Sequence, residues 1–288
     1  MKRVTTRTLM RMKQEQEPIA MITAYDYPTA KIAEEAGADI LLVGDSLGMV
    51  VLGYDSTIPV TLEDMLHHTK AVTRGASRAM VVADMPFMTA HLSGDETLRA
   101  AARLMQEGGA YGVKLEGGET VLSNVERLVS AGIPVMGHLG LTPQSVNQLG
   151  GYRIQGRDEQ AARKLLEDAK RLEEAGVFSL VLECVPEELA QLVTEQLSVP
   201  VIGIGAGRHC DGQVLVYHDL LAIPGGWHPS FVKVYREAGR VMREGISEYV
   251  REVKERRFPE EGHFTRVTGE WLTDLYGGKK EKETNETH

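Results

Sequence analysis

Four carboxylates in this sequence follow short apolar runs, at the points where strands would end. They are Asp45 in DILLVGD, Asp84 in MVVAD, Glu116 in GVKLE and Glu183 in FSLVLE. A carboxylate at the tip of an apolar strand is costly to remove from water unless a cation or hydrogen bonds receive it. Together the four indicate a divalent-cation site, because Mg²⁺ binds a few carboxylates and fills its octahedron with water or substrate oxygens. A nearby carboxylate that is not a ligand can act as a general base.

Each polar residue taken alone also has a purely structural explanation. Asp45 could cap the turn through GDSLG, and Asp84 could accept a hydrogen bond from a backbone N–H. Lys114 could simply pair with Glu116, and His138 could be a hydrogen-bonded core histidine. The coincidence of such residues at the ends of several strands favours a shared site over separate structural roles.

Alternation along the strands indicates which residues share a face. Side chains two positions apart on a strand point the same way, which groups Lys114 with Glu116 on one strand. On the strand before Asp45, the same rule predicts that Leu41 and Val43 point in the direction of Asp45. We therefore expect the polar groups to face one common site.

Eight apolar runs rich in strand-forming residues alternate mostly with helical patterns. The predicted strands are residues 19–24, 39–44, 80–86, 112–117, 134–140, 178–185, 200–205 and 213–221. The last helical pattern covers residues 229–255. Strands separated by helices pair in parallel, so eight of them predict an α/β fold, the (β/α)₈ TIM barrel. An open doubly wound sheet is the alternative. In a barrel, catalytic groups collect at the C-terminal ends of the strands.

The domain organisation is predicted to be simple. One barrel domain covers residues 1–265, because no low-complexity linker divides it. An extra N-terminal helix is indicated by Leu9 and Met12, spaced as on one helical turn, and it would cover the bottom of the barrel or a neighbouring subunit. Residues 266–288 form a C-terminal extension, whose polar end at 277–288 is predicted to be disordered.

Composition and charge exclude several classes of partner. The chain has 32 Lys and Arg against 41 Asp and Glu, and its net charge of −9 disfavours nucleic acid. No apolar run approaches the roughly 20 residues of a membrane helix, and no signal peptide is evident. The two cysteines fit a reducing compartment, so we expect a cytoplasmic protein. The GIGAG segment at 203–207 lies far from the first strand–helix turn, which argues against a dinucleotide site.

Several long segments occur in a fixed order and are specific to one family. They read ITAYDYPTAKIAEEAGAD, LLVGDSLGMVVLGYDSTIPVTLEDM, VVADMPF, GVKLEGG, PVMGHLGLTPQSVNQLGGYRIQG, LVLECVP, VIGIGAGRHCDGQVLVYHDLL and FPEEGHF. Through them, over nearly all of residues 3 to 265, the chain resembles the ketopantoate hydroxymethyltransferases of pantothenate biosynthesis.

The resemblance implies a Mg²⁺-dependent TIM barrel of the phosphoenolpyruvate/pyruvate type. Its reaction moves a hydroxymethyl group from 5,10-methylenetetrahydrofolate to 3-methyl-2-oxobutanoate, giving 2-dehydropantoate and tetrahydrofolate. Mn²⁺ or Co²⁺ could replace Mg²⁺. The resemblance also implies a homodecamer of stacked rings. The implied site comprises the metal ligands Asp45, Asp84 and Glu116, bound directly or through water, the substrate-binding residues Asp45, Ser46, Asp84, Lys114 and His138, and the catalytic base Glu183.

The chemistry of an α-keto acid agrees with these roles. Its keto and carboxylate oxygens can chelate Mg²⁺, which would stabilise the enolate formed when Glu183 removes the C3 proton. Lys114 would neutralise the substrate carboxylate and Ser46 would orient it. The enolate would then attack the methylene carbon of the folate, and water would complete the transfer. Two alternatives stay open, an isocitrate-lyase-like C–C lyase and a non-catalytic barrel that only binds a keto acid or folate.

Overall fold

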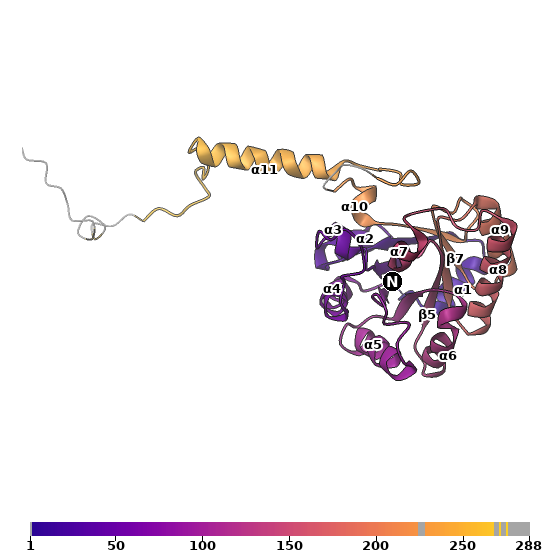
Figure 1. The fold of residues 1–288 in the computed structure, drawn as a ribbon. Helices are drawn as coiled ribbons and strands as arrows, with labels where there is room; N and C mark the ends of the chain where they lie inside the picture. Colours follow the sequence, from indigo (N-terminus) through magenta and orange to yellow (C-terminus); the bar gives the residue numbers. More distant parts are fainter. Residues whose placement is uncertain (1, 224–227, 268–270, 272–274, 276–288) are drawn as a thin grey trace, which may run out of the picture. The chain divides into compact units, whose positions relative to one another are not determined.

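The computed structural model describes residues 2–223, 228–267, 271 and 275. In this part of the chain, eight parallel strands form a closed barrel in sequence order, with β8 pairing to β1 (Figure 1). The predicted TIM barrel is therefore confirmed, and the open sheet is excluded. The strands are β1 (Ile19–Thr23), β2 (Ile40–Val43), β3 (Met80–Asp84), β4 (Gly112–Glu116), β5 (Val135–Gly140), β6 (Ser179–Glu183), β7 (Val201–Ile204) and β8 (Gly212–Leu215).

Helices surround the strands on the outside of the barrel (Figure 1). Most begin with a side chain that accepts a hydrogen bond from the first turn, as Thr61 does for α4 and Ser93 for α5. Residues 205–211, which connect β7 to β8 and are all described, form no helix. The outer helices are α2 (Tyr27–Glu35), α4 (Leu62–Gly75), α5 (Gly94–Gln106), α6 (Leu122–Ser130), α8 (Glu159–Glu174) and α9 (Glu187–Gln196), with short pieces at α3 (Leu47–Val50), η1 (Glu119–Val121), η2 (Pro143–Ser145) and α7 (Val146–Leu149).

Two apolar layers cover the strands. One fills the inside of the barrel, and the other lies between the strands and the surrounding helices. Alternate strand residues such as Leu41 and Val43 pack with the helices in the outer layer. Their neighbours Ile40 and Leu42 pack with other strand residues in the inner layer. This alternation is the expected pattern for parallel strands that are buried on both faces.

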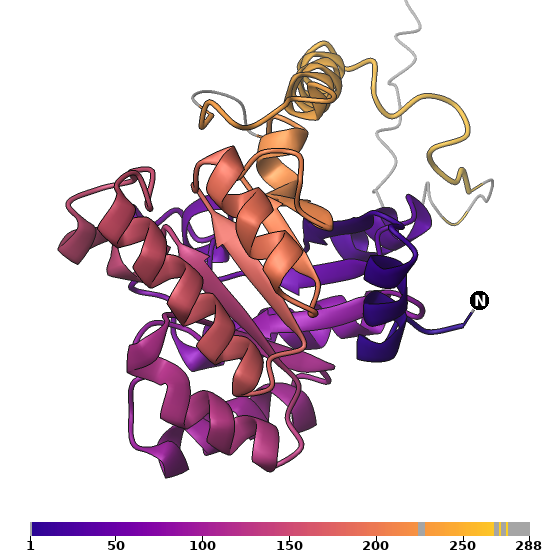
Figure 2. The same cartoon turned by 90° about the vertical axis from the view of Figure 1, so that its right-hand side faces the viewer.

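An N-terminal helix, α1 (Thr6–Gln14), closes one end of the barrel. Thr5 and Thr8 form its capping box, and the buried Leu9 and Met12 belong to the inner layer of the barrel. The helix ends just before β1 begins, so it lies at the N-terminal ends of the strands (Figure 2). The predicted extra helix at the bottom is therefore confirmed.

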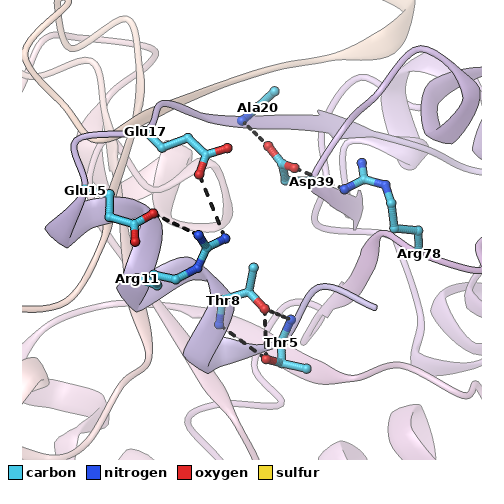
Figure 3. A network of polar contacts seen from close by, with 8 residues as sticks. All are labelled: Thr5, Thr8, Arg11, Glu15, Glu17, Ala20, Asp39 and Arg78. Atoms are coloured by element: carbon cyan, nitrogen blue, oxygen red, sulfur yellow. Dashed lines mark hydrogen bonds and ion pairs between the residues drawn. The ribbon is translucent and has the colours of Figure 1, made fainter. Parts of the chain in front are cut away.

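Polar contacts tie this lower end together. Figure 3 shows the capping pair of α1, Arg11 with Glu15 and Glu17, and Asp39 between the backbone N–H of Ala20 and the guanidinium of Arg78. Nearby, the Lys13 ammonium lies 2.7 Å from Asp211, which comes directly before β8. The start of the last strand is thus bound to the N-terminal helix.

Two predicted elements in the C-terminal part of the chain differ from the structure. The strand expected at 213–221 ends at Leu215, and Tyr217–Leu220 form helix α10 because Asp219 and Leu220 donate to the Val216 carbonyl. The helix expected from residue 229 begins only at Ala238, as α11 (Ala238–Lys254). The backbone N–H of Tyr235 donates to Leu220 instead of continuing a helix.

The chain divides into two compact units, residues 1–238 and residues 239–288. The first contains the barrel, and the second contains α11 from Gly239 onward. The single domain predicted for 1–265 stays a prediction, and the predicted disorder of 277–288 lies outside the described residues. Within the described ranges, no helix is both long and apolar enough to cross a membrane.

Candidate active site

Strand pairing brings most of the predicted polar residues together at the C-terminal end of the barrel. In the parallel register, Asp84 of β3 is paired with Lys114 of β4, and Glu116 is paired with His138 of β5. Glu183, the last residue of β6, is paired with Gly140. Paired residues of parallel strands point to the same face, so these five polar side chains converge inside the barrel.

The side chain of Asp45 also points into the barrel, but not for the predicted reason. Leu41 and Val43 face the outer helices, so the expected common direction with Asp45 is wrong. The strand ends at Val43, and the chain then turns, with the N–H of Leu47 donating to the Gly44 carbonyl. The turn directs Asp45 inward, where its own N–H donates to Asp84 Oδ2 at 3.0 Å.

The charged groups form a continuous buried cluster. Lys114 Nζ lies 2.9 Å from Asp84 Oδ1 and 3.2 Å from His138 Nδ1. His138 in turn lies 3.5 Å from Glu116 Oε1 through Nδ1, and 3.3 Å from Glu183 Oε2 through Nε2. The Lys114–Asp84 and His138–Glu183 contacts have ion-pair distances, although their angles fall outside hydrogen-bond geometry. Of these side chains, Glu183 is the most exposed, at 15% against 3–5% for the others.

Burial of the carboxylates shifts their protonation. Burial, and then the charges of Asp84 and Glu116, raise the pKa of Asp45 well above its ordinary value. Burial also raises the pKa of Asp84, although Lys114 opposes the shift. For Glu116, burial would raise the pKa, but hydrogen bonding and charge from His138 and the charge of Lys114 lower it. The cluster therefore holds more carboxylates than its own cations neutralise.

The two cationic residues respond to the same excess of negative charge. Burial would lower the pKa of Lys114, but Asp84, Glu116 and Asp45 raise it above its ordinary value. Burial and Lys114 would lower the pKa of His138, but its contacts with Glu116 and Glu183 raise it to about 9. Lys114 is therefore held as an ammonium, as expected of a group that binds an anionic substrate.

Gln144 is a site residue that the sequence analysis missed. It lies in η2, in the LTPQS segment after β5, and its side chain is buried. Its amide donates to Asp45 Oδ2 at 2.8 Å and to the Met85 carbonyl at 2.9 Å, and its backbone N–H donates to Glu116 Oε2 at 3.0 Å. A glutamine in so short a helical turn has no periodic signal, so only its place in a family motif could have indicated this role.

Ser46 has a buried partner that was also missed. The Tyr25 phenol lies 2.9 Å from Ser46 Oγ, and Tyr25 is only 1% exposed. Burial raises the pKa of Tyr25, so the phenol stays protonated and can hold the serine hydroxyl in place. Tyr25 follows β1, which places the pair at the same end of the barrel as the carboxylates.

Glycine at position 140 lets β5 end against Glu183. Gly140 has φ +92°, and a Cβ atom there would collide with the Glu183 carbonyl oxygen. That oxygen accepts the backbone N–H of Leu141 at 2.8 Å. A side chain at this position would therefore displace the strand end that carries Glu183.

The donor set of this cluster fits a hard divalent cation. Asp45, Asp84 and Glu116 offer buried oxygens, and burial together with the charges of the other two raises the pKa of Asp45. Within the described residues, no three carboxylate, imidazole or thiolate groups are close enough to form a complete cluster by themselves. Lys114 and Gln144 bond to the carboxylates, so water or substrate oxygens would have to complete the coordination.

Comparison with known proteins identifies sequence relatives over almost the whole chain. The family model for ketopantoate hydroxymethyltransferase matches residues 3–261. A 3-methyl-2-oxobutanoate hydroxymethyltransferase of Bacillus cereus is 58% identical over 276 residues, which cover 96% of this chain and 99% of that protein. One of Bacillus thuringiensis is also 58% identical over the same share of both chains.

Solved structures with the same fold are much more distant in sequence. A phosphonopyruvate hydrolase in complex with oxalate and Mg²⁺ superposes with a TM-score of 0.59 at 12% identity, covering 94% of both chains. A 2,3-dimethylmalate lyase of the PEP mutase/isocitrate lyase superfamily has a TM-score of 0.57 at 16% identity, covering 96% of this chain and 92% of that one. At this identity the similarity supports the barrel fold only.

Proposed function

The chain belongs to the ketopantoate hydroxymethyltransferase family and is a hydroxymethyltransferase, and from this premise we propose a specific reaction for its site. A hydroxymethyl group passes from 5,10-methylenetetrahydrofolate to 3-methyl-2-oxobutanoate, giving 2-dehydropantoate and tetrahydrofolate. The observation that carries the proposal is the buried cluster in which Lys114 and three carboxylates lie beside the more exposed Glu183. A binding protein would not need this separate base.

The keto acid binds through groups already held in place. The Lys114 ammonium attracts the substrate carboxylate, and the Ser46 hydroxyl, fixed by Tyr25, orients it. Asp45, Asp84 and Glu116 would hold Mg²⁺, or Mn²⁺ or Co²⁺, and the cation would supply Lewis-acid stabilisation of negative charge on the keto oxygen. Gln144 keeps two of these carboxylates in position.

Glu183 acts as the base. Its greater exposure leaves it free to reach a substrate atom, and His138 Nε2 lies 3.3 Å from its carboxylate. The C3–H bond of the keto acid breaks, and the proton goes to Glu183. C3 then bonds to the methylene carbon, and both bonds from that carbon to the folate nitrogens break. One water supplies the hydroxyl group, and its second proton and the proton held by Glu183 end on the two nitrogens of tetrahydrofolate.

Proton NMR of the protein with 3-methyl-2-oxobutanoate in D₂O tests this reaction. Samples contain Mg²⁺ or EDTA, before and after addition of 5,10-methylenetetrahydrofolate. We expect metal-dependent loss of the C3 proton signal, then a new hydroxymethyl signal only after the folate is added. A folded, metal-loaded protein with no exchange would contradict the proposal, and exchange without transfer would favour a lyase-type reaction.

We also propose where the enzyme acts and how its subunits assemble. It acts in the cytoplasm as a homodecamer of stacked rings, with no nucleic-acid or membrane partner. The net charge of −9 and the absence of a long apolar run support the last two statements. Analytical ultracentrifugation of the full chain tests the oligomer, since a monomer or dimer would contradict the decamer.

A further inference from the structure

A patch of exposed apolar side chains adjoins the carboxylate cluster. Met49 is 39% exposed, Tyr152 is 53% exposed and Ile154 is 55% exposed, and we refer to these three residues as the mouth patch. Met49 lies in α3, which directly follows Asp45 and Ser46. The Tyr152 hydroxyl donates to Met49 Sδ at 3.7 Å, which joins the two segments.

The loop that carries Tyr152 and Ile154 is fixed beside the predicted base. The backbone N–H of Gln155 donates to the carbonyl of Cys184 at 2.9 Å, and Cys184 is the residue after Glu183. Tyr152 and Ile154 shortly precede Gln155 in the chain, so this bond holds them close to Glu183. Met49, the third residue of the mouth patch, shortly follows Asp45 in the chain and lies in the helix that begins after Ser46.

Electrostatic evidence agrees with this placement. Partial burial raises the pKa of Tyr152, and the charges of Glu183, Asp45 and Glu116 raise it further. The phenol therefore lies within the field of the carboxylates while half of the side chain stays open to solvent. An aromatic ring in this position is available to a ligand that also reaches the buried site.

The reaction proposed above needs a second binding region of this kind. The buried cluster is built from charged and amide side chains, which suit a small keto acid better than the ring system of a folate. The one-carbon unit must come close to C3 of the keto acid, beside Glu183. A donor must therefore place its ring system on the surface that adjoins Glu183.

We propose that Met49, Tyr152 and Ile154 bind the planar bicyclic heterocycle of the one-carbon donor, with the Tyr152 ring stacked against it. This inference rests on the proposed function and adds the location of the second substrate. Stacking on an aromatic ring suits a flat heterocycle because the two surfaces share area without needing matched hydrogen bonds. Met49 adapts its shape to the ring edge, as flexible thioethers do.

Binding of 5-formyltetrahydrofolate, a stable analogue, tests the mouth patch in the full-length protein. Isothermal titration is done with 3-methyl-2-oxobutanoate and Mg²⁺ present. We expect Tyr152→Leu to weaken binding by about tenfold or more, and Tyr152→Phe, which keeps the ring, to stay within about threefold of the wild type. The KM for the donor should rise in parallel in Tyr152→Leu, with a change of less than about twofold in the KM for the keto acid.

A matched pair of isoleucines controls for loss of apolar surface. Ile154→Ala is expected to weaken binding by about threefold, by loss of buried apolar area. Ile32→Ala removes a side chain of nearly equal exposure, 54% against 55%, from α2 on the outside of the barrel, and should leave binding unchanged. Circular dichroism of each variant confirms that it is folded.

The outcomes separate this inference from the proposed function. Unchanged analogue binding in both Tyr152→Leu and Ile154→Ala would overturn the mouth patch, even if the wild type shows C3 exchange and transfer. A change in oligomeric state without a change in analogue binding would overturn it too, because the patch would then be a subunit contact. Wild-type protein that binds the analogue through Tyr152 without C3 exchange would contradict the proposed function and support the patch.

Discussion

The two ends of the barrel use charge in opposite ways. At the N-terminal end, carboxylates meet matching donors, as Asp39 does with Arg78 and Asp211 does with Lys13. At the C-terminal end, Asp45, Asp84, Glu116 and Glu183 share one ammonium and one imidazole. The carboxylates at the N-terminal end are compensated by their partners, whereas those at the C-terminal end outnumber the cations beside them, as the proposed binding of a divalent cation requires. Substitutions at the two ends should therefore affect different measurements.

The largest effect is expected from Glu183→Gln. Removing the base should lower the rate of C3 proton exchange by about a thousandfold, within the usual range for a positioned general base. Binding of the keto acid and of Mg²⁺ should persist, because other residues hold them. Proton NMR in D₂O measures the exchange, and exchange at the wild-type rate would remove Glu183 from the base role.

Lys114→Met is expected to affect both the stability of the protein and its binding of the keto acid. The substitution leaves Asp84 buried without its ammonium partner at 2.9 Å, which should lower the free energy of unfolding by about 3 kcal/mol. The KM for the keto acid should rise by about a hundredfold, because a charge-assisted contact with its carboxylate is lost. Urea unfolding and steady-state kinetics measure the two effects. A variant with wild-type KM would show that the substrate carboxylate binds elsewhere.

Gln144→Leu tests how the carboxylate of Asp45 is positioned at the C-terminal end without removing a charged group. The substitution frees the carboxylate of Asp45 from its amide donor, and the apparent affinity for Mn²⁺ should fall by about tenfold to a hundredfold, as for other groups that orient metal ligands. Electron paramagnetic resonance of free Mn²⁺ measures the affinity. Gln191→Leu is the control, since the amide of Gln191 bonds only to Glu195 on α9 in the described contacts. Equal Mn²⁺ affinity in both variants would contradict the positioning role.

Asp39→Asn is the matching test at the N-terminal end. The substitution weakens the contact with Arg78 and the bond from the Ala20 N–H, so the free energy of unfolding should fall by about 1 kcal/mol. The KM and kcat values should stay at the wild-type level. Urea unfolding and kinetics again provide the measurements, and a large loss of activity without loss of stability would break the division between the two ends.

The smallest effect is a dependence of stability on pH at the N-terminal end. Partial burial would raise the pKa of Glu34, but the Ser77 hydroxyl and the N–H groups of Ala79, Arg78 and Ser77 lower it from 4.5 to about 2. A carboxyl with a lower pKa in the folded state stabilises the protein above its unfolded pKa. That contribution is lost as the pH falls from about 4.5 to about 2.

Glu34→Gln should remove this part of the acid sensitivity. Thermal unfolding at about pH 6 and about pH 3 should show a smaller difference in midpoint for the variant than for the wild type. Glu35→Gln, on the same helix, is the control. Equal pH dependence in wild type and Glu34→Gln would show that Glu34 titrates alike in both states.

Much of the barrel could be predicted because its strands repeat one simple pattern. Each apolar run between helices became a strand, and polar residues at strand ends such as Asp84 and Glu116 were brought together by parallel pairing. The direction of Asp45 could not be predicted, because alternation ends where the strand ends and the turn after Gly44 is set by its own hydrogen bonds. A turn of this kind has no periodicity in the sequence.

Residues outside the strands were harder to assign. Gln144 joins Asp45 to the Met85 carbonyl across segments far apart in the chain, and nothing in its own neighbours indicates that contact. The late start of α11 has a similar cause, since the segment before it bonds to the region of α10. In both cases the deciding interactions are tertiary, so local propensity alone predicts the wrong partner or boundary.

The closure of the barrel sets an order for its assembly during synthesis. Ile19 of the first strand pairs with Gly212 of the last, and the Tyr217 N–H donates to Thr23. The ring of strands therefore cannot close until the chain has left the ribosome beyond residue 217. Until then β1 has an unpaired edge, a state that exposes nascent chains to aggregation and makes folding slow. The active-site strands β3 to β6 lie between these two partners and can pair earlier.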